Sequence, residues 1–154
     1  MKKMFLSNNP LSSSVSIFIL RLVAGGSMLS HGFPKLQKVL AGEFQFADPF
    51  GLGPEVSLFM AVFAEVICSV LLILGLFTRL ALIPLIITMA VAFFLIHGSD
   101  DYKVKELAFI YLCMYLSIFF SGAGKISIDQ MINKWDILQN SVWKQSKFLL
   151  VLKF

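Results

Sequence analysis

Four long apolar stretches constrain the fold of this chain more than any other feature. They cover about residues 14–30, 57–77, 80–96 and 107–120. The hydrocarbon core of a bilayer is about 30 Å thick, and a helix needs roughly 20 residues, within a range of about 17–25, to cross it. The first three stretches meet this length, and the fourth is shorter. Because the stretches are continuous rather than alternating, we expect membrane-spanning helices and not barrel strands.

Composition excludes an ordinary soluble domain. Of the 154 residues, 58% are hydrophobic and only 14% are charged, and the mean hydropathy is +0.84. Soluble domains are about 45–50% apolar and about 25% charged. The sixteen Phe residues could not be hidden in so small a core, and two Cys cannot make a disulfide scaffold. The sequence therefore predicts an all-α polytopic membrane protein, an antiparallel four-helix bundle with a long first loop and a C-terminal interfacial helix.

The chain is predicted to divide into a four-helix membrane domain over 1–124 and a cytoplasmic amphipathic tail over 125–154. Arg21 interrupts the first apolar stretch and no convincing cleavage pattern follows, so this stretch is interpreted as a retained helix rather than a signal peptide. Thr78-Arg79 predicts a tight turn between the second and third helices, after a long first loop over 31–56.

The tail is predicted to begin a helix at Ser127, which suits an N-cap position. Apolar residues then recur at helical spacing, at Ile128, Met131, Ile132 and Trp135. Together with Trp143 and Lys144, this pattern is typical of a helix that lies at a membrane surface.

Basic residues predict the orientation, since cytoplasmic loops carry an excess of Lys and Arg. With four spans, one side of the membrane would carry Lys2, Lys3, Arg79, Lys125, Lys134, Lys144, Lys147 and Lys153. The other side would carry only Lys35, Lys38, Lys103 and Lys105. We therefore expect both termini to be cytoplasmic. The net charge of +4 is explained by this pattern and by anionic lipid, so no nucleic-acid partner is expected.

Two charged residues lie inside predicted spans, Arg21 in the first and Glu65 in the second. A charge at a helix centre costs about 2.5–3.5 kcal/mol on insertion scales, so such residues face protein or water. We expect Arg21 and Glu65 to pair, either as a structural clamp or as part of a site for chemistry. The spacing of residues on the first helix also indicates a polar interior. Five residues lie within about 40° of one line along this helix and so share one face: Arg21, Gly25, Met28, Gly32 and Lys35.

Four further polar residues fall at the extracytoplasmic level in the predicted topology: His31, His97, Lys35 and Glu106. They could form a polar mouth that handles a proton, an anion or a quinone headgroup. Alternatively, they only mark helix ends at the headgroup level. No metal site is predicted, because two His and scattered carboxylates lack the spacing of metal ligands.

Cys68 and Cys113 fall at similar predicted depths, in the second and fourth spans. A redox pair is one interpretation. The other is that both are small apolar side chains that pack between helices. Neither belongs to a C-x-x-C motif.

The order and spacing of several short motifs resemble the DoxX family of small four-helix bacterial membrane proteins. The matching pieces are Arg21-Leu22 with Gly25, His31-Gly32-Phe33-Pro34-Lys35-Leu36, Glu65, Gly75-Leu76-Phe77-Thr78-Arg79, Glu106-Leu107 and Gly122-Ala-Gly-Lys-Ile-Ser-Ile-Asp129. The resemblance covers about residues 14–130, with Ala123 standing where a proline is common. It implies a location in the bacterial cytoplasmic membrane.

The family takes its name from a subunit linked to thiosulfate:quinone oxidoreductase, and other members look like partners of redox or detoxifying enzymes. The resemblance thus implies a membrane subunit of a redox system, with a soluble or membrane redox partner and possible oligomers. No haem, flavin or Fe–S motif is present in the sequence.

Two functional hypotheses follow. In the first, the polar interior binds a quinone, the one cofactor considered, and the candidate site residues are Arg21, His31, Lys35, Glu65 and Glu106, with His97, Cys68 and Cys113 secondary. No catalytic residue is assigned. In the second, the chain is a non-catalytic membrane anchor or assembly partner, or a small transporter.

Overall fold

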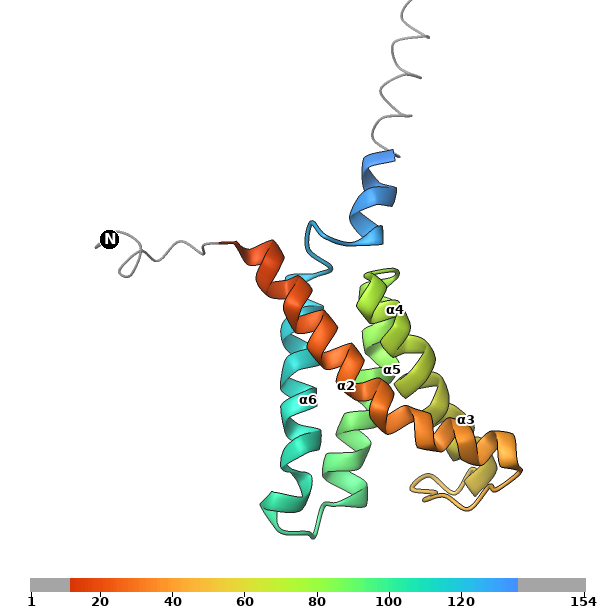
Figure 1. Cartoon of the computed structure of the whole chain (residues 1–154). Helices are drawn as coiled ribbons and strands as arrows, with labels where there is room; N and C mark the ends of the chain where they lie inside the picture. Colours follow the sequence, from red (N-terminus) through yellow and green to blue (C-terminus); the bar gives the residue numbers. More distant parts are fainter. Residues whose placement is uncertain (1–11, 136–154) are drawn as a thin grey trace, which may run out of the picture.

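The apolar stretches form helices, since only internal hydrogen bonds can satisfy a backbone in lipid. The computed structural model describes residues 12–135 (Figure 1). Its elements are α2 (Ser13–Ala41), α3 (Pro54–Val62), η1 (Phe63–Cys68), α4 (Ser69–Leu74), α5 (Thr78–Val91), η2 (Ala92–Ile96) and α6 (Tyr102–Ser121). Within the described residues, α3, η1 and α4 form one continuous helix, α5 and η2 form another, and four such helices are long and apolar enough to cross a membrane. The prediction of an all-α membrane bundle is confirmed.

The first helix is longer than predicted. α2 continues to Ala41 instead of ending near residue 30, and it contains Pro34. It ends at Gly42, whose φ of 75° is the left-handed conformation that glycine adopts without strain. The first loop is therefore confined to residues 42–53, and Lys35 lies on a helix rather than in a loop.

Two ends of the bundle can be distinguished. The loop end carries residues 42–53 and 97–101, and the turn end carries residues 75–77 and 122–127. In Figure 1 the loop end is at the bottom and the turn end at the top, and α2 crosses the other helices obliquely. Tight crossing is possible because Gly25 and Gly32 lie on α2. A Cβ atom at Gly25 would be 2.6 Å from Cγ1 of Ile73, and one at Gly32 would be 2.8 Å from Cγ2 of Val66.

The tight turn lies at residues 75–77, slightly before the predicted Thr78-Arg79, because α5 already begins at Thr78. Asp129 fixes this start from a distant part of the chain. Its two carboxylate oxygens accept hydrogen bonds from the backbone N–H groups of Phe77 (2.7 Å) and Thr78 (2.9 Å). The carboxylate thereby satisfies amides that a helix N-terminus leaves unpaired.

The start of the tail helix is confirmed. The Ser127 hydroxyl accepts a hydrogen bond from the backbone N–H of Gln130 at 3.2 Å, as an N-cap does. Residues 128–135 are helical. The rest of the predicted tail, including Trp143 and Lys144, lies outside the described residues.

The packing at the turn end predicts that replacing two different glycines by alanine has different effects on thermal stability. Gly75 has a φ of +69°, and a Cβ atom there would lie 2.5 Å from Nη2 of Arg21 and 2.6 Å from Cβ of Ser127. We expect Gly75→Ala to lower the thermal midpoint in detergent clearly. The matched control is Gly26→Ala on α2, where a Cβ atom meets nothing within 4 Å. Since alanine is favoured over glycine inside a helix by roughly 0.5–1 kcal/mol, the control should be neutral or slightly stabilising. Equal effects of both would contradict this packing.

Candidate functional site

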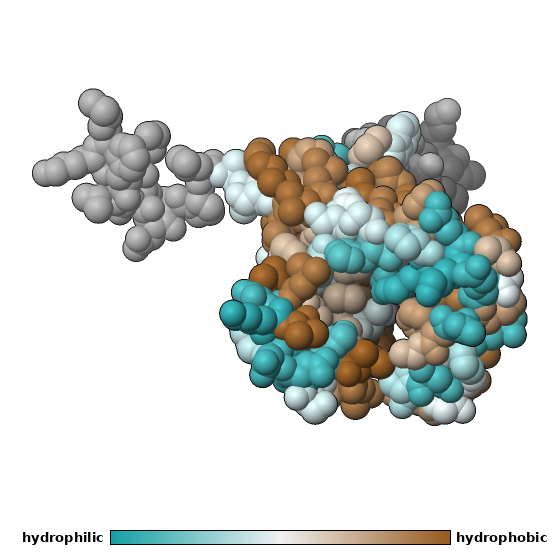
Figure 2. All heavy atoms as spheres, turned by 60° about the horizontal axis from the view of Figure 1, so that its bottom comes forward, coloured by the Kyte–Doolittle hydropathy of each residue, from teal (hydrophilic) through white to brown (hydrophobic). Residues whose placement is uncertain are grey.

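A large cavity of about 770 Å³ lies between the helices toward the loop end. Its wall comes from α2, α3, η1, α5, η2 and α6 and from the first loop. Most of the lining is apolar, and the polar exceptions are His31, Lys35, Ser57, Glu65, Thr88, His97 and Tyr111. Figure 2 looks onto the loop end, where hydrophilic residues gather and the surface is hollowed between them. Ligand sites typically combine such an apolar wall with a few polar groups.

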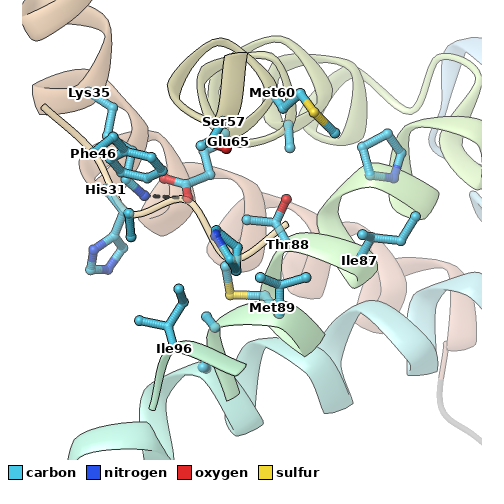
Figure 3. Close-up of a pocket in the computed structure, with 18 of the residues that line it drawn as sticks. His31, Lys35, Phe46, Ser57, Met60, Glu65, Ile87, Thr88, Met89 and Ile96 are labelled. Carbon is cyan, nitrogen blue, oxygen red and sulfur yellow. Dashed lines mark hydrogen bonds and ion pairs between the residues drawn. The ribbon is translucent and has the colours of Figure 1, made fainter. Parts of the chain in front are cut away.

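The two charged residues of the cavity form an ion pair. Nζ of Lys35 donates to Oε1 of Glu65 (Figure 3). The Glu65 side chain is only 2% exposed, while that of Lys35 is 26% exposed. The ammonium also lies 5.7 Å from the centre of the Phe46 ring, within the range of a cation–π contact. A buried carboxylate in an apolar wall is tolerable because this partner is present.

One oxygen of the Glu65 carboxylate is not used by the ion pair. Oε2 of Glu65 is buried and has no hydrogen-bond partner in the described part of the chain. Glu65 lies in η1, a π-helical segment, and η2 on the opposite wall is π-helical too. Such segments are frequent at functional sites. An orphaned buried acceptor costs about 1–3 kcal/mol, so its retention favours a use outside packing.

The histidines lie on the cavity wall with different partners. The ring of His31 contacts that of Tyr111 edge-on, with centroids 5.9 Å apart. Nδ1 of His97 lies 2.8 Å from Oδ2 of Asp100, on the loop end. In Figure 3, His31, Lys35 and Glu65 lie together on one side of the cavity, across from the apolar side chains of α5. The structure thus brings together four of the predicted site residues: His31, Lys35, Glu65 and His97.

Arg21 is not in this group, and the predicted Arg21–Glu65 pair is wrong. Arg21 is 1% exposed and donates only to backbone carbonyls at the turn end. The acceptors are Leu72 (2.9 Å), Ile73 (2.8 Å), Ala123 (2.5 Å) and Ile126 (2.9 Å). Two are carbonyls in the last turn of α4, of which that of Leu72 also accepts from the backbone N–H of Gly75 at 3.1 Å. The guanidinium, with five donors in a fixed fork, therefore joins α2 to the end of α4 and to the segment after α6.

The remaining candidates lie outside the cavity lining. Glu106 is exposed on α6. Cys68 is buried in the core and Cys113 is exposed, and neither is in a disulfide.

The first loop forms part of the cavity wall, with Phe46, Ala47, Pro49 and Phe50 in the lining. Asp48 holds this loop on the start of α3. It accepts hydrogen bonds from the backbone N–H groups of Leu52 (3.0 Å) and Gly53 (2.7 Å) and from the Ser57 hydroxyl (2.8 Å). The sequence reasoning missed this role, although Asp48-Pro49 directly before Gly51 and Gly53 is a typical turn signal.

Asp48 makes the loop sensitive to acid. The hydrogen bond from Gly53 lowers the pKa of the Asp48 carboxyl below its ordinary value, and those from Ser57 and Leu52 act in the same direction. Because its pKa is depressed in the folded chain, the Asp48 carboxylate stabilises the loop fully at pH values above the ordinary aspartate pKa of about 3.9. This contribution is lost as the pH falls through the lowered pKa.

We therefore expect Asp48→Ala at neutral pH to increase hydrogen exchange at the Leu52 and Gly53 amides, as strong acid should in the wild type. The control is Glu43→Ala, which removes an exposed carboxylate from the same loop. Unchanged protection of both amides in Asp48→Ala would show that the carboxylate does not hold the loop.

Comparison with known proteins gives a family and no function. The sequence model of the DoxX family matches residues 16–98. An uncharacterized protein of Haemophilus influenzae is 32% identical over 136 residues, which are 80% of this chain and 87% of the relative. A second uncharacterized protein of the same organism is 33% identical over 126 residues, 75% of this chain and 89% of the relative. No solved structure matches.

Proposed function

The chain belongs to the DoxX family of membrane proteins, and on that premise we propose that it is the membrane component of a quinone-linked redox system, with the quinone headgroup in the cavity. The observation that carries the proposal is the buried Lys35–Glu65 pair inside an otherwise apolar cavity of about 770 Å³. A quinone has both the polar and the apolar groups that such a cavity can bind. Its oxygens can bind Lys35 and Glu65, and its ring and hydrocarbon tail suit the apolar wall.

The membrane location of the cavity also favours a lipid-soluble ligand. Several wall residues are exposed on the outer surface of the helices, among them Phe59, Met60, Phe63 and Ile87. In a bilayer these positions face acyl chains, so a ligand dissolved in the membrane meets the cavity wall directly. Electrons for the quinone would come from a soluble or membrane redox protein that docks on this chain.

Quinone that co-purifies with the protein tests the proposal. We expect about one quinone per chain after gentle solubilisation and solvent extraction. The double variant Lys35→Met with Glu65→Leu should lose it, while the exposed-residue control Lys38→Met should keep it. The absence of quinone from the wild type, together with an unchanged quinone pool in a deletion strain, would contradict the proposal.

A second candidate function is a non-catalytic assembly partner, which the turn end favours. Arg21 and Asp129 fix the segment that leads to the helical residues 128–135. This helix exposes Met131, Ile132 and Trp135, which could contact a membrane surface or another protein. The assembly role does not need the cavity, so loss of function in the Lys35–Glu65 variants separates the two candidates.

We further propose that the turn end faces the cytoplasm of a bacterial inner membrane, with both termini on that side. In a chain whose two cysteines are replaced by alanine, Ser99→Cys at the loop end should react with an impermeant thiol reagent added to intact cells. Lys134→Cys should react only after the membrane is opened. The reverse labelling pattern would overturn this orientation.

A further inference from the structure

We infer that the Lys35–Glu65 site selects the reduced, hydroxyl-bearing form of a quinone headgroup over the oxidised form. This inference rests on the proposed function and specifies which state of the ligand the cavity prefers. It comes from an imbalance between hydrogen-bond donors and acceptors. Glu65 keeps one buried carboxylate oxygen, Oε2, without a hydrogen-bond partner among the described residues.

The ion pair determines what this oxygen can do. Lys35 forms an ion pair with Oε1, and the carboxylate of an ion pair accepts hydrogen bonds but donates none. Oε2 therefore needs a donor. Lys35 supplies none to it in the structure, because its contact is with Oε1.

The two redox states of a quinone differ in this respect. A quinone headgroup presents carbonyl oxygens, which are acceptors only, and a carbonyl placed against Oε2 would meet another lone pair. A quinol presents O–H groups, which can donate to Oε2. The oxygen of the same hydroxyl can still accept from Lys35, whose ammonium has three donors and uses one on Glu65.

The oxygen can be reached without rebuilding the site. Glu65 belongs to the cavity wall, although Oε2 itself is covered in the structure. The terminal torsion of a glutamate has a broad energy well, so a modest rotation of the carboxylate turns Oε2 toward a ligand. Lys35 is the single lysine of the lining, so the headgroup meets one cation and one anion side by side.

Binding of a short-tailed ubiquinone and its quinol, measured anaerobically on the full chain in nanodiscs, tests the inference. We expect the quinol to bind at least about tenfold more tightly. For a two-electron couple this factor raises the midpoint potential of the bound ligand by about 30 mV. Potentiometric titration of the wild type checks this shift without any variant.

Glu65→Gln supplies the sharper comparison. Its amide presents both a donor and an acceptor, so the preference for quinol should fall to about parity or reverse. The control Glu55→Gln changes an exposed glutamate outside the cavity lining and should keep the wild-type preference. Wild-type binding of quinone that equals or exceeds that of quinol would overturn this inference and leave the proposed function standing. Failure of both forms to bind would overturn both.

Discussion

Replacement of Arg21 by methionine is expected to destabilise the bundle by about 3–5 kcal/mol, because several buried hydrogen bonds from a charged donor are lost and one such bond contributes about 1.5–3 kcal/mol. The guanidinium is the hydrogen-bond partner of four backbone carbonyls from two separate segments. Methionine fills a similar volume but donates nothing, so the carbonyls of Ile73, Ala123 and Ile126 lose this donor, at about 1–3 kcal/mol for each acceptor left unpaired. The Leu72 carbonyl keeps the backbone N–H of Gly75. Thermal unfolding in detergent measures the loss. Arg79→Met, which removes an exposed arginine of the same turn end, is the control and should change little.

A second prediction for Arg21 concerns its energetic coupling to Glu65. Because Arg21 and Glu65 have different partners, the effects of Arg21→Met and Glu65→Leu on stability should add. A coupling energy above about 0.5 kcal/mol between these two positions would show that they share a network after all.

The second large effect is expected at the ion pair of the cavity. Lys35→Met leaves Glu65 as an uncompensated buried carboxylate, so we expect a loss of about 3–5 kcal/mol. The double variant Lys35→Met with Glu65→Leu removes both charges and should recover most of the stability, since apolar replacement of a whole buried pair is often neutral. Stability and complementation of a deletion strain are measured in parallel.

The ion-pair series separates structure from function. If the pair serves the proposed site, the double variant should be stable but inactive. Lys38→Met, a change at an exposed position on the same helix, should retain both stability and activity. If the double variant restored activity together with stability, the pair would have a structural role only.

The fold was largely predictable because hydrophobic length and continuity dictate spans in a bilayer. The buried face of α2 was predictable as well: Arg21, Gly25, Met28 and Gly32 are all buried, as the helical spacing indicates. The positions of the helix ends were not predictable to the same degree. α2 continues through Pro34 to Ala41 and ends at Gly42. Residues 35–41 are mostly good helix formers followed by a glycine, so local propensity favours this extension, and Pro34 was wrongly interpreted as part of a loop.

The partners of the buried charges could not be predicted for a different reason. Both Arg21 and Lys35 lie on the polar face of α2, separated by about 21 Å along the helix at 1.5 Å per residue. Glu65 can pair with only one of them, and the choice depends on how α2 crosses the second helix. The carbonyl acceptors of Arg21 were invisible in the sequence, because any residue can supply a backbone oxygen.

The central claim is that the cavity beside Lys35 and Glu65 holds a quinone headgroup, and photolabelling tests it most directly. A short-tailed azidoquinone is illuminated with the wild-type protein in nanodiscs, and labelled peptides are identified by mass spectrometry. We predict saturable labelling of the cavity-lining segments in α2, η1 and α5 that excess unlabelled quinone prevents. Labelling confined to outward-facing residues such as Leu80 and Phe120, and unaffected by the competitor, would contradict the account.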